Sequence, residues 1–547
     1  MSRTLVCGGL VVDGTGREAF SADVLVEGDR IADVAPSGGA RRAAAETVID
    51  ATGCLVTPGF IDAHAHSDTY LLLEPDAPSK LSQGITTEIN GQCGGSAVPR
   101  YGAARLSSDW ASMTYPGGDG RPGPTWRSMA EYRALLDQVR PAINTVQFVG
   151  HNTLRSSVIG YDAVRATPSA MREMENLLAR ELDDGGWGLT TGLIYQPGKY
   201  SDVAEVTALV RVAAAHGGMY ATHMRSEGDA IIEAIDEVLD LVRATGIRAE
   251  ISHLKTSGRR NWRKIDDVLS KIERAVGAGE LLGSDRYPYC AAGTDLDVVF
   301  PDWAGEGGTA AEIERLKDPA VRARIAAEID AQDRDWSTVM VGGTWSDATR
   351  KYSGRSVGEL IAEARRVEDN APYHTVGELV CSILAADACR TGAFFFGMSE
   401  DNLQKILERP WIVPGSDASL RAPWGPLGKD HPHPRAYGTM PRFFRMLTGR
   451  VEGHARICSR EEAVRRMTSA PAERFGIRER GTIRCGAYAD IAVWREDAFR
   501  ETATYTSPHS FCEGVEAVLV NGAVSYRAGR FTGDRAGRFL ERTNRMD

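Results

Sequence analysis

Short runs of alternating hydrophobic and polar residues occupy both ends of the chain. Near the start, Thr4–Val12 is the first of several such runs, and glycine-containing turns separate them. Near the end, Thr482–Trp494 and Val515–Tyr526 are rich in the same kind of strand. A period of two is typical of strands with one buried face. We therefore expect residues 1–57 and 479–547 to form one small domain, a β-sandwich built from both chain termini.

The central residues 58–478 follow a different pattern, in which apolar strand-like runs alternate with helical ones. In one helical run Ile231, Ile235 and Val238 share a face. Gly246 follows as its predicted end. Eight strand-like runs alternate with helices in this way: Cys54–His66, Ile85–Gly91, Thr145–Gly150, Trp187–Leu193, Met219–Met224, Ile247–Lys255, Leu281–Tyr289 and Trp411–Asp417.

This alternation predicts an α/β fold, a (β/α)8 TIM-like barrel. A doubly wound open sheet is the alternative, but no glycine-rich phosphate loop follows the first strand. The seventh and eighth strands are far apart, because Asp285 and Asp417 are separated by 132 residues. We expect a long insertion at about 290–410 between them, acting as a lid over the site. A peripheral subdomain or an oligomer contact is the alternative role.

The net charge excludes some classes of function, and the cysteines indicate a cellular location. The formal net charge is −10, so we expect no binding to nucleic acid or to an anionic membrane surface. Apolar runs are too short for a membrane span, and the N-terminus has no signal-peptide pattern. The nine cysteines are scattered singly with no CxxC pair. Reduced thiols and a cytoplasmic location are the simplest interpretation.

Six residues with metal-ligand chemistry fall at the ends of predicted strands. His64 and His66 are two residues apart, so in a strand their imidazoles face the same way. A lone histidine at such a place is more often structural than a ligand. Here, however, four further residues lie at strand ends, where barrel active sites form: Cys93, His223, His253 and Asp417. Imidazole and thiolate together suit Zn²⁺.

Several motifs resemble the amidohydrolase superfamily, namely TPGFIDAHAHSD at 57–68, GITTEINGQCG at 84–94, THMRSEG at 222–228, ISHLK at 251–255 and GSDAS at 415–419. More narrowly, the chain resembles the N-acyl-D-amino-acid deacylases, or D-aminoacylases. That match is based on GQCG around Cys93, TTGLIYQPG at 190–198, DRYPY at 285–289 and HPRAYGTMPR at 433–442, and it covers essentially the whole chain.

The resemblance implies how metal ions are held. A tightly bound Zn²⁺ would be held by Cys93, His223 and His253. A second, weaker metal would lie near the remaining three ligands: His64, His66 and Asp417. The related hydantoinase-like branch uses a carboxylated lysine on strand four. The corresponding run here, Trp187–Leu193, has no lysine, and Cys93 can supply the anionic ligand instead.

The resemblance also implies an activity. It predicts hydrolysis of the amide bond of N-acyl-D-amino acids, releasing a carboxylate and a free D-amino acid. Asp417 would be the general base that deprotonates the attacking water and then protonates the leaving amine. Lys255, Tyr195 and Tyr287 would bind the α-carboxylate of the small-molecule substrate. Position adds to this, since Lys255 lies two residues after His253 and Arg225 two after His223, so on regular strands both would face the cavity. Arg225 is expected to orient Glu227 or the substrate.

Two other functions are compatible with the sequence. A related enzyme could act on a cyclic amide or another N-acyl compound, because Leu254 and Gly293 replace a histidine and a serine that are common in the family. A non-catalytic barrel used as an interaction scaffold is the second alternative. The sequence leaves the side chain and acyl group of the substrate open, and likewise whether the chain forms a homo-oligomer.

Overall fold

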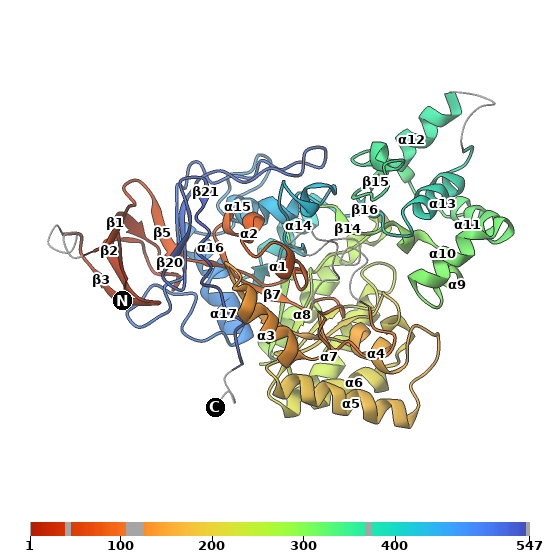
Figure 1. Cartoon of the computed structure of the whole chain (residues 1–547), viewed down its shortest axis with the longest axis horizontal. Helices are drawn as coiled ribbons and strands as arrows, with labels where there is room; N and C mark the ends of the chain where they lie inside the picture. The colour runs from red at the N-terminus through yellow and green to blue at the C-terminus, as the bar shows by residue number, and fades with distance from the viewer. Residues whose placement is uncertain (1, 39–44, 106–124, 367–372, 543–547) are drawn as a thin grey trace.

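The structure is a computed structural model that describes residues 2–38, 45–105, 125–366 and 373–542. It is an α/β protein, as the sequence predicts. Figure 1 shows a β-sheet at one end of the molecule, an α/β centre, and a group of helices at the other end. Within the described residues, no helix is long and apolar enough to cross a membrane.

Strands from both chain termini join in one sheet. Its order is β21-β20-β19-β18-β5-β1-β2-β3, and β4 pairs with β1 in addition. The strands are β1 (Arg3–Val11), β2 (Phe20–Glu27), β3 (Arg30–Ala35), β4 (Thr47–Asp50), β5 (Leu55–Pro58), β18 (Ile491–Trp494), β19 (Val515–Val520), β20 (Ala523–Arg527) and β21 (Arg530–Phe531). The antiparallel pair of β5 and β18 connects the N-terminal and C-terminal strands. The strand order does not show whether this sheet folds into a sandwich, so the β-sandwich remains a prediction.

Two parallel sheets form the centre of the molecule. The smaller has the order β6 (Phe60–Asp62), β7 (Ile85–Asn90) and β8 (Asn144–Gln147). The larger has the order β17 (Ile412–Pro414), β13 (Leu282–Arg286), β12 (Arg248–Ile251), β11 (Met219–His223), β10 (Gly188–Gly192) and β9 (Val149–Gly150). These strands occur within the eight predicted runs and in the same order along the chain.

The two parallel sheets are connected at both edges. β8 and β9 follow each other in the chain with one residue between them. At the other edge, Ala63 N donates to the Pro414 carbonyl at 3.0 Å, and Asp417 N donates to the His64 carbonyl at 2.8 Å. The second of these bonds brings two predicted site residues to the same edge.

The first predicted strand, Cys54–His66, is wrong as a single strand. Its residues divide between β5, which belongs to the terminal sheet, and β6, which belongs to the central one. Gly59 lies at the crossing, and a Cβ there would be 2.2 Å from the Thr86 side chain. Only glycine allows this close approach. A hydrophobic run cannot reveal that its two halves pack into different sheets.

Amphipathic helices cover the central sheets. In α7 (Ile231–Thr245) the predicted face of Ile231, Ile235 and Val238 is buried, and Gly246 ends the helix with φ 65°. Burying each such side chain contributes about 1.5–3 kcal/mol. The other helices of this central part are α1 (Tyr70–Leu73), α2 (Pro78–Leu81), α3 (Met129–Val139), α4 (His151–Val158), α5 (Pro168–Asp183), α6 (Val203–Ala215), α8 (Ile265–Gly277), α14 (Glu400–Leu407), α15 (Arg435–Leu447), α16 (Arg460–Met467) and α17 (Ser469–Phe475).

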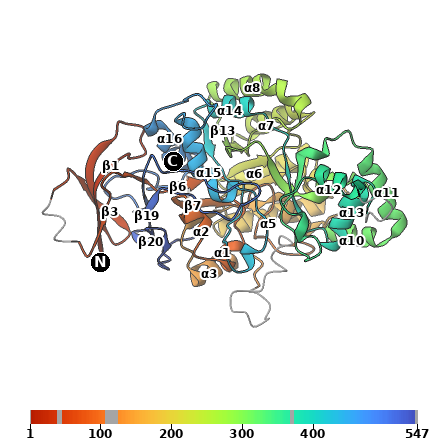
Figure 2. The same ribbon diagram turned by 90° about the horizontal axis from the view of Figure 1, so that it is seen from above.

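The chain between β13 and β17 contains a substructure of its own. A three-stranded antiparallel sheet has the order β14 (Ala292–Asp295), β16 (Gly392–Phe395) and β15 (Val339–Val341). Its helices are α9 (Asp302–Gly305), α10 (Thr309–Lys317), α11 (Pro319–Asp330), α12 (Val357–Ala364) and α13 (Val376–Ala386). A separate hydrophobic cluster packs them together. In both views these helices lie at the opposite end of the molecule from β1–β3 (Figures 1 and 2).

Candidate active site

The six predicted metal ligands lie at or just beyond the carboxyl ends of central strands. His64 and His66 follow β6, Cys93 follows β7, and Asp417 follows β17. His223 is the last residue of β11, and His253 follows β12. Local sequence therefore places all six at the same edge of the central sheets.

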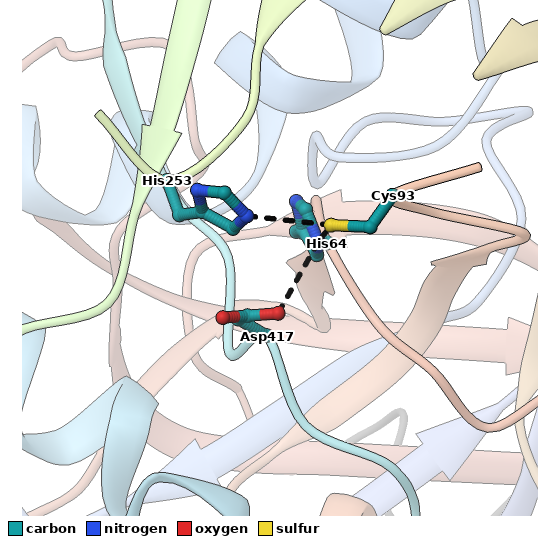
Figure 3. Close-up of side chains that lie close together, drawn as sticks. All are labelled: His64, Cys93, His253 and Asp417. Atoms are coloured by element: carbon teal, nitrogen blue, oxygen red, sulfur yellow. Dashed lines mark hydrogen bonds and ion pairs between the residues drawn. The ribbon is translucent and has the colours of Figure 1, made fainter. Parts of the chain in front are cut away.

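Four of these side chains point toward one another (Figure 3). The Cys93 Sγ lies 3.4 Å from His64 Nε2 and 3.3 Å from His253 Nε2. The Asp417 Oδ1 lies 3.4 Å from His64 Nε2. One ligand atom from each of the four residues falls within 4.8 Å of all the others. His66 joins the group through its Nε2, which is 3.0 Å from Asp417 Oδ1.

A second group shares His253 with the first. It consists of His223, Glu227 and His253, again with ligand atoms within 4.8 Å of one another. Both ring nitrogens of His223 are buried and make no hydrogen bond in the described structure. A buried imidazole without partners is costly. Coordination of a metal ion by His223 would satisfy it, so the donors present fit such an ion.

The electrostatics of the first group suit a thiolate ligand. Burial alone would raise the pKa of the Cys93 thiol. The neighbouring His64 and His253, together with the close contact between His253 Nε2 and Cys93 Sγ, instead hold that pKa well below its usual value. The thiolate is the form of cysteine that binds metals.

Three ligands have left-handed backbone conformations. The φ angles are 52° at Cys93, 37° at His253 and 50° at Asp417. Residues other than glycine rarely adopt such angles, and they persist where surrounding contacts fix them. The His253 amide donates to Asp285 Oδ1 at 2.9 Å, which is one such contact. They are three of the ten described residues other than glycine that have positive φ angles.

Sequence reasoning identified Asp285 only as the end of a strand. Besides holding the His253 amide, its Oδ2 lies 3.1 Å from His64 Nδ1. A carboxylate on one ring nitrogen leaves the other free to face a metal, and here Nε2 faces Cys93. The position of Asp285 at the end of β13, level with the other ligands, was the available signal.

Glu227 is a second carboxylate behind the ligands. Its Oε1 lies 3.0 Å from His253 Nδ1 and 2.5 Å from Lys255 Nζ. Burial would raise the Glu227 pKa, but the surrounding histidines and Lys255 lower it. The structure does not agree with the predicted role of Arg225, which was to orient Glu227 or the substrate. Arg225 Nη2 instead lies 2.9 Å from Glu237 Oε1.

The predicted substrate-binding residues are divided between a cavity and the protein interior. The cavity, of about 390 Å³, opens beside Cys93 and Asp417, and Tyr195 is in its wall. Lys255 and Tyr287 are buried behind it and are not among its lining residues. Lys255 Nζ already has partners inside the protein, because it also lies 2.8 Å from His253 Nδ1 and donates to the His253 carbonyl at 3.3 Å. The Tyr287 hydroxyl is buried and has no hydrogen-bond partner in the described residues.

The insertion and the segment after Asp417 form the walls of the cavity. Thr294 and Phe394 contribute from β14 and β16, and Arg421 and Arg435 contribute from the chain after Asp417. Arg435 Nη1 lies 2.7 Å from Asp417 Oδ2. Burial would raise the Asp417 pKa, but Arg435, with His253 and His66, holds it well below its ordinary value. The sequence contained Arg435 in the HPRAYGTMPR motif but gave no sign of this partner.

Comparisons with known proteins agree with this geometry. The profile described as Amidohydrolase family matches residues 47–526. The N-acyl-D-glutamate deacylase of Alcaligenes xylosoxydans xylosoxydans is 34% identical over 96% of this chain and 95% of its own length. The D-aminoacylase of the same organism is 33% identical, covering 98% of this chain and 97% of its own.

Solved structures give the same result. The N-acyl-D-glutamate deacylase of Bordetella bronchiseptica, solved with zinc and a phosphonate inhibitor, has a TM-score of 0.78 and 30% identity, covering 98% of this chain and 99% of its own. A D-aminoacylase described as having a binuclear metal centre has the same TM-score, 31% identity and the same coverage. The chain therefore belongs to the amidohydrolase family, and it is a metal-dependent hydrolase of linear amides rather than a non-catalytic scaffold.

Proposed function

We propose that this protein hydrolyses N-acyl-D-amino acids to a carboxylate and a free D-amino acid. The observation that carries the proposal is the group of His64, Cys93, His253 and Asp417 beside a cavity of about 390 Å³. The substrate class comes from the relatives, whose names specify N-acyl-D-glutamate and D-amino acids. A cavity of this volume is suited to a small molecule.

We propose Zn²⁺ as the metal. Cys93, His223 and His253 would hold the tighter ion, and His64, His66 and Asp417 a weaker second one. Cys93 Sγ lies 3.4 Å from His64 Nε2 and 3.3 Å from His253 Nε2, so the two sites would be adjacent. When bound, Zn²⁺ lowers the pKa of water from about 15.7 to about 7 and polarises a carbonyl oxygen.

Asp417 is the proposed general base. Its lowered pKa keeps the carboxylate ionised at neutral pH, so it can accept a proton from the attacking water. The protonated carboxyl then returns this proton to the nitrogen of the leaving amine as the C–N bond breaks. Arg435 holds Oδ2, while Oδ1 faces His64 and His66, so Oδ1 lies on the side of the proposed metal ligands.

Recognition of the α-carboxylate is assigned to Tyr195, Tyr287 and Lys255. The unpartnered Tyr287 hydroxyl offers a buried donor. Lys255 would bind the carboxylate in place of one of its present partners. Its weakest bond, at 3.3 Å to the His253 carbonyl, is the one that we expect the carboxylate to replace.

We also propose that the central strands form a closed barrel and that the protein is cytoplasmic. A closed (β/α)8 barrel is supported by the bonds from Ala63 to Pro414 and from Asp417 to His64 across the edges of the parallel sheets. A cytoplasmic location is supported by the cysteines, because all nine lie in the described residues and none of them forms a disulfide there.

The decisive experiment is a panel of N-acetyl-D-amino acids with acidic, basic and apolar side chains. Their L-enantiomers and a cyclic amide such as a hydantoin serve as controls. We expect release of free amino acid from at least one D-substrate by the zinc-loaded protein, and little from its L-form. Turnover of the cyclic amide alone would instead support the alternative function.

A further inference from the structure

One lysine is buried without access to the cavity. Lys80 in α2 is fully buried, and its Nζ lies 2.8 Å from Asp62 Oδ2 and 3.3 Å from Glu88 Oε2. The two carboxylates, which lie in β6 and β7, are also fully buried. Burying three charges is expensive, and replacing such a group by apolar residues is often neutral or stabilising. A contribution to stability therefore does not explain why this group is here.

The contacts of Lys80 lead to the segment that carries Asp417. Its Nζ donates to the Ser416 hydroxyl at 3.2 Å and to the Ala418 carbonyl at 3.1 Å. These residues precede and follow Asp417 directly. Asp62 completes the arrangement, because it accepts the Ser416 amide at 2.7 Å and the Ser416 hydroxyl at 2.6 Å.

The same network reaches the strands that carry the other ligands. Glu88 Oε2 accepts from the Ser67 hydroxyl at 2.9 Å, and this hydroxyl accepts the Leu420 amide at 2.9 Å. Asp62 and Ser67 flank the His64 and His66 pair in the chain. The segment after β17 is therefore tied, on both sides of Asp417, to the segment after β6.

Asp417 needs such support because its backbone is strained. Its φ of 50° is unfavourable for a residue with a Cβ. Strained conformations persist where neighbouring contacts over-determine them. Lys80 supplies two of these contacts at once and, through Asp62, fixes the donor groups of Ser416.

We propose that Lys80 is a positioning residue for the reaction. It holds the peptide segment 416–418 so that the Asp417 carboxylate faces His64 and His66. Lys80 does not contact the cavity and takes no part in proton transfer. This inference rests on the proposed role of Asp417 as general base, and the test separates the two.

The test compares Lys80→Met and Ser416→Ala with Ser82→Ala as a matched control. Ser82 is equally buried at the end of α2, but among the described residues its hydroxyl donates only to the Ser79 carbonyl. For Ser416→Ala we expect kcat at least tenfold lower, with KM within twofold and the zinc content unchanged. Ser82→Ala should retain the kcat of the wild type. Crystal structures of the variants should show a displaced Asp417 carboxylate.

The combined variant gives a further criterion. Because Lys80 and Ser416 act on the same segment, their effects on kcat should be much less than multiplicative. An Asp417 carboxylate in its original place, with kcat within twofold in Ser416→Ala, would overturn the inference. If Lys80→Met does not fold, Ser416→Ala decides alone. If the wild-type protein hydrolyses no substrate of the panel, the proposed function fails. The crystal structures of the variants then still show whether the Asp417 carboxylate is displaced, and so whether Lys80 positions it.

Discussion

The guanidinium of Arg435 and the carboxylate of Asp417 form an ion pair at 2.7 Å, although 18 residues separate them in the sequence. Both side chains are largely buried, with exposed fractions of 7% and 11%. Burial on its own would favour the neutral carboxylic acid. The ion pair reverses this preference, so Arg435 determines the protonation state of the proposed general base.

Replacing Arg435 with glutamine should move the acid limb of the pH–rate profile. Arg435 lowers the pKa of Asp417, so its removal raises that pKa. A cation at this distance typically lowers a carboxyl pKa by about 1–3 units. The base is active when ionised, so the acid limb of kcat/KM should shift to higher pH. An unshifted limb in a zinc-loaded variant would contradict this account.

Asp417→Asn tests the base itself. Asparagine has nearly the same size but cannot accept the proton. Loss of general-base catalysis typically costs about 10²–10⁴-fold in rate. We expect a fall in kcat of this order, with the tighter zinc ion retained after dialysis. Activity near that of the wild type would refute the assignment of Asp417.

Cys93→Ala tests the ligand set. The Sγ of Cys93 is close to nitrogens of both His64 and His253, so its loss removes the thiolate donor of the group. We expect the tighter zinc to be lost on dialysis, as measured by elemental analysis. Cys290→Ala is a suitable control, because the structure describes this partly buried cysteine as free and it belongs to neither group of metal donors. A Cys93→Ala protein that keeps one zinc per chain would show that Cys93 is not a ligand of the tighter zinc.

The sequence predicted which residue types occupy the strand ends, because strand periodicity and turn signals are local. It could not predict which side chains meet. His64 and Asp285 are 221 residues apart, and their contact depends on the packing of β6 against β17 and β13. The same limit applies to the ion pair of Arg435 with Asp417. This contact depends on the path of the segment after Asp417, which local sequence does not reveal.

Lys255 shows a second limit of the sequence. Its position two residues after His253 predicted that it faces the same cavity. The left-handed conformation of His253, with φ 37°, breaks the alternation on which this prediction depends. Lys255 instead lies behind His253, in contact with Glu227. Strand periodicity fails where the backbone leaves the extended conformation, and in this site it does so at three ligands.

Tyr287→Phe and Lys255→Met should separate binding from chemistry. Both residues are proposed to bind the α-carboxylate, and neither is proposed to transfer a proton. Removing a hydrogen bond to a charged group costs about 1.5–3 kcal/mol. For Tyr287→Phe we expect KM to rise by roughly 10- to 150-fold, with a smaller change in kcat. Lys255 also contacts His253, so Lys255→Met should lower zinc affinity as well. An unchanged KM in Tyr287→Phe would remove it from the substrate site.

Glu181→Gln should stabilise the protein at neutral and alkaline pH. Glu181 is a buried residue of α5 that accepts the Met129 amide at 2.6 Å, and burial raises its pKa from 4.5 to about 7. A carboxyl whose pKa is raised on folding stabilises the protein less as pH rises from the unfolded pKa to the folded one. A shift of this size corresponds to about 3 kcal/mol at most. Thermal unfolding should therefore show a gain for Glu181→Gln that is larger at pH 8 than at pH 4.5. An equal effect at both pH values would mean that Glu181 has an ordinary pKa in the folded protein.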